Sequence, residues 1–256
     1  MLKVIKNKFN FYVNQNYEFW KNYQKNQYED CFFKYINKKI YSDFTFVDIG
    51  ASIGALSLYS SHVFKKVISL EPDRQAFKDL KNNIRLNEKN IKNIKALNYA
   101  LLTNDKKINF SYGEVFNSIH FLNKQRKYDY LVKGISLKKL FNIYIKNKLF
   151  FLKIDIEGYE FTLFKDRDFL EIIKKYKPPM YFAIHLGANY LLKYKIAQNN
   201  FFQPFLNLGK TIAEYNLIFN ILKNYSTIMI NNKKVSRLFF LNIKFYRKNI
   251  EIYCYN

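Results

Sequence analysis

The residues best suited to bind a ligand are the glycines and the acid in the segment FTFVDIGASIG, Phe44–Gly54. Its first half predicts a short buried strand that ends at Asp48, and the residues after Gly54 have helical character. A strand, a turn of small residues and a helix form the unit with which parallel α/β sheets bind nucleotide-like ligands. Glycines at both ends of the turn let backbone N–H groups approach the ligand, and the helix N-terminus faces it.

The spacing of these glycines separates the turn from two common phosphate-binding loops. It differs from the G-x-G-x-x-G of dinucleotide enzymes, and no Lys-Ser/Thr pair follows it as in a P-loop. The turn can therefore serve a smaller ligand with a charged amino-acid end. The alternative is a tight turn that binds nothing. We favour ligand binding, because the chain has only seven glycines and two of them lie in this turn.

A second acid narrows the choice of ligand. The apolar run Val67–Leu70 predicts a strand, and Glu71 follows it one strand–helix–strand unit after the first. An acid there accepts hydrogen bonds from two ribose hydroxyls, although a lone acid is more often a solvated surface residue. With the glycine pattern, Glu71 favours S-adenosyl-L-methionine over NAD. The predicted cofactor-binding residues are Asp48, Gly50, Ala51, Ser52, Gly54, Glu71 and Asp155, with Tyr99 and Ala100 beside the adenine at the end of a third strand. A core aromatic explains Tyr99 equally well.

Two further strand ends carry side chains that could act as a base. Phe150–Ile154 and Met180–Ile184 predict strands, and Asp155 and His185 follow them. Methyl transfer needs alignment of acceptor oxygen, methyl and sulfur, which contributes up to ~7–11 kcal/mol. A base that removes the hydroxyl proton adds roughly 10²–10⁴-fold. The alternatives are that Asp155 only caps the next helix and that His185 only satisfies a local hydrogen bond. The spacing of Asp155, Glu157 and His185 is too loose to predict a metal site.

At these motifs the chain resembles the FkbM-type S-adenosylmethionine-dependent methyltransferases. The matching segments are D-I-G-A-x-x-G at Asp48–Gly54, E-P at Glu71–Pro72, L-x-x-N-x-x-L-N at Leu80–Asn87 and K-I-D-I-E-G-Y-E at Lys153–Glu160. The resemblance extends over Tyr41–His185. It departs at Ser52, where the family usually has Asn, and at Ala183, where an acid often precedes the x-His pair. It implies an O-methyltransferase that acts on a hydroxyl of a sugar, a glycan or a related small molecule, and it favours Asp155 as a site residue.

Alternating strands and helices predict one α/β domain with a doubly wound, mainly parallel sheet. The resemblance implies the Rossmann-like fold of class I methyltransferases. The expected parts are an N-terminal helical extension (1–43), a cofactor-binding core (44–185), and a C-terminal helix with edge strands (186–256).

Patterns within these parts predict particular elements. Apolar residues at helical spacing predict an amphipathic helix over Tyr28–Ile40 that covers one edge of the sheet. An antiparallel edge is expected from a hairpin of Leu238–Phe245 and Ile250–Tyr255. The other predicted helices are Asp73–Leu86, with Asp73 as its N-cap, Leu137–Ile145 after a Ser136 N-cap, and Asp166–Tyr176.

The net charge of +23 on 256 residues invites a nucleic-acid partner. However, lysines are spread over every segment, and Lys, Asn, Ile, Phe and Tyr are abundant together, as codons rich in A and T would produce. No RNA-binding or zinc-finger motif is present. We therefore expect no specific nucleic-acid binding. RNA or DNA methylation stays as an alternative function, and so does a cofactor-binding protein without catalysis.

The remaining composition predicts a cytoplasmic protein without a metal centre. No apolar run is long enough to span a bilayer, and MLKVIKNKFNFYVNQ lacks the apolar segment and cleavage site of a signal peptide. The only cysteines, Cys31 and Cys254, have no metal-ligand spacing and are expected to be reduced thiols. The expected partner is a small-molecule or glycan acceptor.

Overall fold

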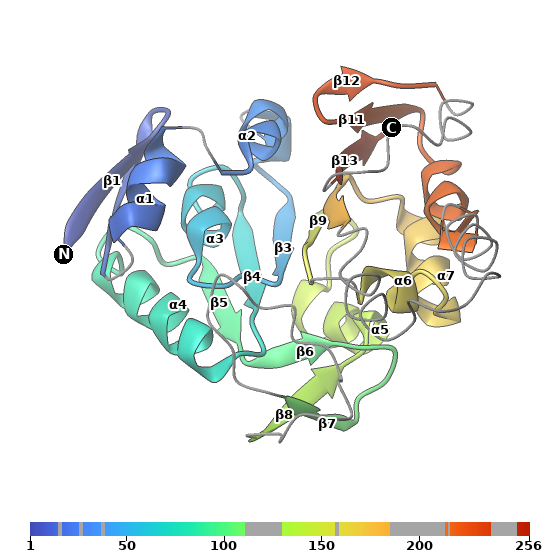
Figure 1. Ribbon diagram of the computed structural model, residues 1–256, viewed down its shortest axis with the longest axis horizontal. Coiled ribbons are helices and arrows are strands. Elements are labelled where there is room, and N and C mark those ends of the chain that lie inside the picture. Colours follow the sequence, from blue (N-terminus) through green and yellow to red (C-terminus); the bar gives the residue numbers. More distant parts are fainter. Residues whose placement is uncertain are drawn as a thin grey trace, which may run out of the picture.

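Figure 1 shows the protein as a computed structural model in which a central layer of strands lies between two groups of helices. The described residues are 1–14, 17–25, 28–36, 39–110, 130–156, 159–184, 213–214, 216–236 and 250–256. Within these ranges, no helix combines the length and the apolar character that crossing a membrane requires.

The central layer is an eight-stranded sheet. In spatial order its strands are β12 (Lys233–Lys234), β11 (Thr227–Ile230), β13 (Ile250–Tyr255), β10 (Met180–Ile184), β9 (Phe150–Ile154), β3 (Thr45–Ile49), β4 (Lys66–Leu70) and β5 (Ile94–Leu97). The strands from β10 to β5 are parallel, and each strand beyond β10 is antiparallel to its neighbour. The chain runs outward from β3 to β5 and then returns to β9, so the winding reverses between β3 and β9. The predicted doubly wound, mainly parallel sheet with an antiparallel edge is confirmed.

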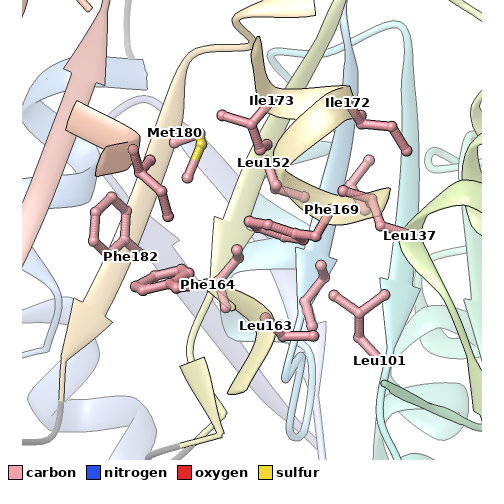
Figure 2. Close-up of a cluster of buried hydrophobic side chains, with 14 of the residues drawn as sticks. Leu101, Leu137, Leu152, Leu163, Phe164, Phe169, Ile172, Ile173, Met180 and Phe182 are labelled. Carbon is pink, nitrogen blue, oxygen red and sulfur yellow. The ribbon is translucent and has the colours of Figure 1, made fainter. Parts of the chain in front are cut away.

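One face of the sheet packs against the helices of the second half of the chain. Successive side chains of a strand point to opposite faces, and Leu152 and Ile154 of β9 point to this one. Figure 2 shows Phe164 and Phe169 packing beside Leu152 in this apolar cluster. The helical segments on this face are α5 (Leu137–Leu140), a π-helical turn (Phe141–Ile145), α6 (Glu160–Leu163), α7 (Arg167–Tyr176) and residues 216–222.

The other face is covered by the N-terminal segment and the first helices of the core, which lie to the left of the sheet in Figure 1. Aromatic side chains dominate the contact, with Trp20 and Phe32 buried in the same cluster as Phe151 and Tyr181 of the sheet. The elements are β1 (Leu2–Lys6), β2 (Phe9–Val13), α1 (Tyr17–Gln24), α2 (Asp30–Ile36), a 3-10 turn (Lys39–Tyr41), α3 (Ala55–Ser60) and α4 (Arg74–Leu86).

The predicted N-terminal helical extension is helical only in part, because a β-hairpin precedes helices α1 and α2. Strands β1 and β2 pair in antiparallel, and Val4, Phe11 and Val13 point inward with the two-residue period of strands. Asn7 adopts the left-handed φ of 52° that a tight hairpin turn requires. The amphipathic helix predicted over Tyr28–Ile40 is shorter, since α2 covers only Asp30–Ile36.

Two asparagines, Asn83 of α4 and Asn87 at its C-cap, join this hairpin to the core. Asn87 accepts a hydrogen bond from Tyr12 N at 2.8 Å and donates one to Tyr12 O at 2.7 Å, as a neighbouring strand would. Asn83 accepts from Asn14 N and donates to Ile53 O, both at 3.0 Å. Both side chains are buried. The L-x-x-N-x-x-L-N segment therefore has a structural role that connects the hairpin with the turn after β3.

The N-caps predicted for two helices, Asp73 and Ser136, are confirmed, and Asp166 is a third N-cap that was not predicted. Asp73 accepts from two backbone N–H groups at the start of α4, Ser136 accepts from Lys139 N, and Asp166 accepts from Phe169 N. The helix predicted over Leu137–Ile145 is α-helical only in its first turn and continues as a π-helix.

The C-terminal hairpin is paired differently from the prediction. Strand β13 lies between β10 and β11, so both of its edges are occupied. The expected pairing with Leu238–Phe245 is therefore wrong, and that segment lies outside the described residues. The hairpin observed here joins β11 to β12 through Asn231 and Asn232, which both have positive φ.

The end of the third strand also differs. Strand β5 of the main sheet ends at Leu97, and after Asn98 the chain enters a separate three-stranded sheet. This sheet has the order β6 (Tyr99–Leu101), β8 (Tyr130–Ile135), β7 (Lys107–Phe110). Tyr99 and Ala100 therefore begin a new sheet and do not end the third strand of the main one.

Candidate functional site

The turn after β3 has the backbone conformation that its glycines predict. Gly50 and Gly54 have φ of 78° and 94°, and Ser52 also has a positive φ of 49°. A side chain on Gly54 would come within 2.6 Å of Leu80 Cδ1, so glycine also permits close packing on α4. Only residues that tolerate the left-handed region fit such a turn at low cost.

The backbone N–H groups of this turn are used inside the protein. Gly50 N and Ala51 N both donate to Leu70 O, at 3.0 and 2.9 Å, and Gly54 N donates to Ala51 O at 2.9 Å. Ser52 N donates to the Glu71 carboxylate. The prediction that these N–H groups face the ligand is therefore wrong for the described structure. The turn offers a ligand a surface with few side chains, fixed against β4.

The structure brings this turn against the predicted base. A Cβ atom on Gly50 would overlap the backbone carbonyl oxygen of Asp155, so glycine is required for the approach. Asp155 N donates to Ile49 O at 3.1 Å, which continues the pairing of β3 with β9 past the strand ends. Two segments that are a hundred residues apart in the sequence thus meet at the carboxyl edge of the sheet.

Asp48 was predicted to contact the cofactor, but its carboxylate is fully buried beneath the turn. Ser57 Oγ donates to Asp48 Oδ2 at 2.6 Å, and Lys153 Nζ lies 3.3 Å from Asp48 Oδ1. Lys153 Nζ also donates to Gly50 O at 2.8 Å. The observed role of Asp48 is to hold the turn and β9 together through Lys153.

Lys153 is a site residue that the sequence reasoning missed. Its side chain is 3% exposed. Burial opposes its positive charge, but the neighbouring Asp48, Asp155 and Glu29 carboxylates outweigh burial and raise the pKa of Lys153. The available signal was a lysine within the otherwise apolar run of β9, because a buried charge requires a partner.

Glu71 lies at the end of β4 and is clamped by the backbone. Its Oε2 accepts from Ser52 N at 2.7 Å and its Oε1 accepts from Asp73 N at 2.8 Å. Burial raises the pKa of Glu71 to about 7, although these two N–H groups act in the opposite direction. A carboxylate has about four acceptor positions, so Glu71 can still accept from ribose hydroxyls.

Because Glu71 titrates near neutrality, we expect cofactor binding to depend on pH. The ionised carboxylate accepts hydrogen bonds better, so the affinity for S-adenosylmethionine should rise as pH increases from about 6 to about 8. Stability should change in the opposite direction. The pKa of Glu71 is raised from its ordinary 4.5 to about 7, so the folded protein holds a proton that the unfolded chain has released. The free energy of unfolding should therefore fall as pH rises from about 4.5 to about 7.

Calorimetric titration at several pH values tests this expectation. Glu71→Gln should weaken binding by roughly 1.5–3 kcal/mol and remove the pH dependence. Glu88→Gln, at an exposed carboxylate after α4, is the matched control and should behave as the wild type. An affinity of Glu71→Gln equal to that of the wild type would remove Glu71 from the site.

The residues predicted to flank the adenine, Tyr99 and Ala100, lie just after the end of β5. Asn98 Nδ2 donates to Glu71 O at 2.8 Å, which fixes the end of β4 to the end of β5. Tyr99 packs against the apolar cluster of the second half of the chain, and Ala100 is buried in a small cluster with Leu102 and Val132. Contact of Tyr99 and Ala100 with the adenine stays a prediction.

Tyr130, at the start of β8, is a second residue that the sequence reasoning missed. Its hydroxyl donates to Asp73 Oδ2 at 2.9 Å and accepts from Arg74 N at 3.0 Å. The Arg74 guanidinium lies 4.3 Å from the centre of the Tyr130 ring. Tyr130 therefore fixes the N-cap of α4, Asp73, which lies two residues beyond Glu71. No local pattern around Tyr130 indicates this contact.

The start of the helix after β9 tests the alternative role of Asp155, which is to cap that helix. Helix α6 begins at Glu160, and its N-cap position is Tyr159, so Asp155 does not cap it. The buried Glu160 accepts from Ile156 N at 2.8 Å and closes the intervening turn. The capping hypothesis for Asp155 is therefore wrong, and its action as a base stays a prediction.

The other residues considered for catalysis cannot be placed. His185 and Glu157 lie outside the described residues. Within the described residues, no group of three or more His, Cys, Asp or Glu side chains is arranged to hold a metal ion.

Comparisons with family models and with solved structures each include a match to an FkbM methyltransferase. A family model described as "Methyltransferase FkbM domain" matches residues 48–215, more than half of the chain. No curated protein matches the sequence.

Among solved structures, the chain is similar to the methyltransferase FkbM of Methylobacillus flagellatus KT, with 17% identity and a TM-score of 0.50. The match covers 95% of this chain but only 56% of that one, so the chain spans little more than half of that relative. A Streptococcus mutans protein described as a methyltransferase, in complex with SAH, matches with 12% identity and a TM-score of 0.44, over 88% of this chain and 96% of that one. At this identity the first likeness shows the fold, which is the Rossmann-like fold expected from the sequence.

Proposed function

Since the chain belongs to the FkbM methyltransferase family, we propose that it transfers a methyl group from S-adenosylmethionine to a hydroxyl of a sugar, a glycan or a related small molecule. One observation carries the cofactor assignment. The Ser52 N–H donates directly to Glu71 Oε2 while Gly50 abuts Asp155, so the turn, the ribose acceptor and the candidate base form one site. This site lies where the winding of the sheet reverses, the usual ligand position in open α/β sheets.

Each residue of the site has a separate role in such a reaction. Glu71 binds the two ribose hydroxyls, and the turn from Gly50 to Gly54 lets the ligand lie close to the backbone. The cofactor supplies a methyl group on a positively charged sulfur, which leaves as a neutral thioether. Asp155 accepts the proton of the acceptor hydroxyl as that oxygen bonds to the methyl group. Lys153 holds Asp48 and the turn in place and does not touch the reacting atoms.

We also propose that the acceptor is not a nucleic acid. The charge of +23 is spread over the whole chain, and it supports a sequence-independent attraction that salt would screen. A salt-resistant, structure-specific RNA complex in a gel-shift assay would contradict this part of the proposal.

Calorimetric titration tests the cofactor assignment. We expect S-adenosylmethionine and S-adenosylhomocysteine to bind and NAD to show no binding at the same concentrations. Methyl transfer would then be followed by mass spectrometry with isotope-labelled S-adenosylmethionine. Binding of NAD in preference to S-adenosylmethionine would overturn the proposal.

A further inference from the structure

Three polar side chains that this scheme does not use lie together on the N-terminal face of the sheet. They are Glu29, just before α2, Tyr181 of β10 and Glu251 of β13, and we call them the Tyr181 cluster. In the strand register Tyr181 lies opposite Lys153, and Glu251 lies opposite Ala183. Since Tyr181 and Ala183 are two residues apart, Tyr181 and Glu251 point to the same face.

The cluster contains buried polar atoms without hydrogen bonds. Tyr181 is 1% exposed, and its hydroxyl approaches the Glu251 carboxylate without forming a hydrogen bond of ordinary geometry. In the described part of the chain, Glu29 Oε2 and Glu251 Oε2 are also buried without a hydrogen-bond partner. Buried polar groups of native proteins are almost always hydrogen-bonded. By contrast, the buried hydroxyl of Tyr225 has a hydrogen-bond partner, since it donates to Pro178 O at 2.8 Å.

The cluster adjoins the candidate base. Asp155 follows Lys153 by two residues, on the face that Tyr181 shares. Burial raises the pKa of Glu29 well above its ordinary value. Lys153 acts against this shift, and the carboxylates of Asp155 and Glu251 add to it. Glu29 therefore interacts electrostatically with Lys153, Asp155 and Glu251.

We propose that the Tyr181 cluster is the part of the site that binds the methyl acceptor, and that it selects a neutral, hydroxyl-rich molecule such as an uncharged sugar. This inference rests on the proposed function. Carboxylate oxygens accept hydrogen bonds from hydroxyl groups, and a phenol both donates and accepts. The free oxygens of Glu29 and Glu251 and the Tyr181 hydroxyl supply such a set beside Asp155.

The charges of the site argue against an anionic acceptor. A phosphate or carboxylate on the acceptor would have to leave water for this buried site and approach the carboxylates of Glu251 and Asp155, where like charges repel strongly. The raised pKa of Glu29 favours its neutral form, which offers an anion no compensating positive charge. The cation that the described residues place beside the cluster is Lys153, which already pairs with Asp48 and donates to Gly50 O. We therefore expect sugar phosphates and uronic acids to be poor acceptors.

The first test needs no acceptor. If the Tyr181 hydroxyl is reserved for a ligand, Tyr181→Phe should leave the thermal midpoint unchanged or raise it, because an unpartnered buried hydroxyl is removed. Tyr225→Phe is the matched control and should lower the midpoint by about 2–4 °C, since it removes a formed hydrogen bond. A decrease for Tyr181→Phe equal to that of Tyr225→Phe would show a structural hydroxyl and overturn the inference.

The second test uses defined acceptors. Wild type and the variants Tyr181→Phe and Glu251→Gln would receive labelled S-adenosylmethionine with neutral methyl hexosides, with hexose 6-phosphates or with hexuronic acids. We expect methylation of a neutral hexoside, a loss of at least tenfold in kcat/KM in the variants, and a Kd for S-adenosylmethionine within twofold of wild type. Preferred methylation of a charged probe, or kcat/KM unchanged in both variants, would overturn the inference.

The cofactor titration separates the two proposals. If wild type fails to bind S-adenosylmethionine, the proposed function is wrong and this inference falls with it. If the cofactor binds but no neutral hexoside is methylated, only the inference about the acceptor is overturned.

Discussion

Replacing Asp155 by asparagine is expected to lower methyl transfer roughly 10²–10⁴-fold while the fold and cofactor binding remain. Asparagine keeps the shape of the side chain but cannot accept the proton of the acceptor hydroxyl. The backbone contacts that place this residue, Asp155 N to Ile49 O and Asp155 O against Gly50, do not involve the carboxylate. The loss should therefore appear in kcat, with little change in the Kd of S-adenosylmethionine.

Single-turnover kinetics with labelled cofactor would measure this effect. Asp166→Asn is the matched control, because Asp166 caps α7 and asparagine caps a helix about as well as aspartate. His185→Gln provides the parallel test of the other predicted base. Wild-type rates for Asp155→Asn would assign the role to His185. Full activity in both variants would leave alignment of the acceptor as the source of catalysis.

Replacing Lys153 by methionine should have the largest effect on stability. The substitution leaves the fully buried Asp48 carboxylate without its ion pair and Gly50 O without its donor. Loss of one partner of a buried pair costs about 3–5 kcal/mol. In a domain of this size, such a loss lowers the thermal midpoint by roughly 6–20 °C.

Urea unfolding followed by circular dichroism would measure the change. Lys138→Met is the control, because Lys138 and its partner Asp168 are 60% and 44% exposed, and such pairs contribute about 1 kcal/mol or less. Adding Asp48→Asn to Lys153→Met should restore part of the lost stability, since it removes the uncompensated charge. A loss for Lys153→Met no greater than that for Lys138→Met would show that the pair does not support the turn.

The sequence was sufficient to predict the parts of the site that lie within one strand–turn–helix unit. The positive φ of Gly50 and Gly54 and the place of Glu71 follow from local patterns. The place of Asp155 at the same edge of the sheet as the turn followed from the rule that parallel strands end at one edge. These predictions needed only the pattern of strands and turns along the chain and did not require knowing which strands are neighbours in the sheet. The direct approach of Asp155 to Gly50 depends on β9 lying beside β3 and was not predicted.

Contacts between distant elements could not be predicted in this way. The pairing of Asp48 with Lys153 depends on which strand lies beside β3, and the sequence fixes no neighbour for a strand. The Tyr181 cluster combines an N-terminal residue with two strands of the second half of the chain. The same limitation explains why Asp48 was expected to face the cofactor and why the hairpin of Ile250–Tyr255 was paired incorrectly.

The place of β13 in the sheet has a consequence for biosynthesis. This strand is the interior neighbour of both β10 and β11, yet it follows them in the chain, so it leaves the ribosome after both. Until it arrives, the apolar edge of β10 has no partner on that side, and open strand edges promote association with other chains. Residues 250–255 must therefore be inserted between two strands that are already synthesised. Chaperones that cover exposed strand edges would act during this interval.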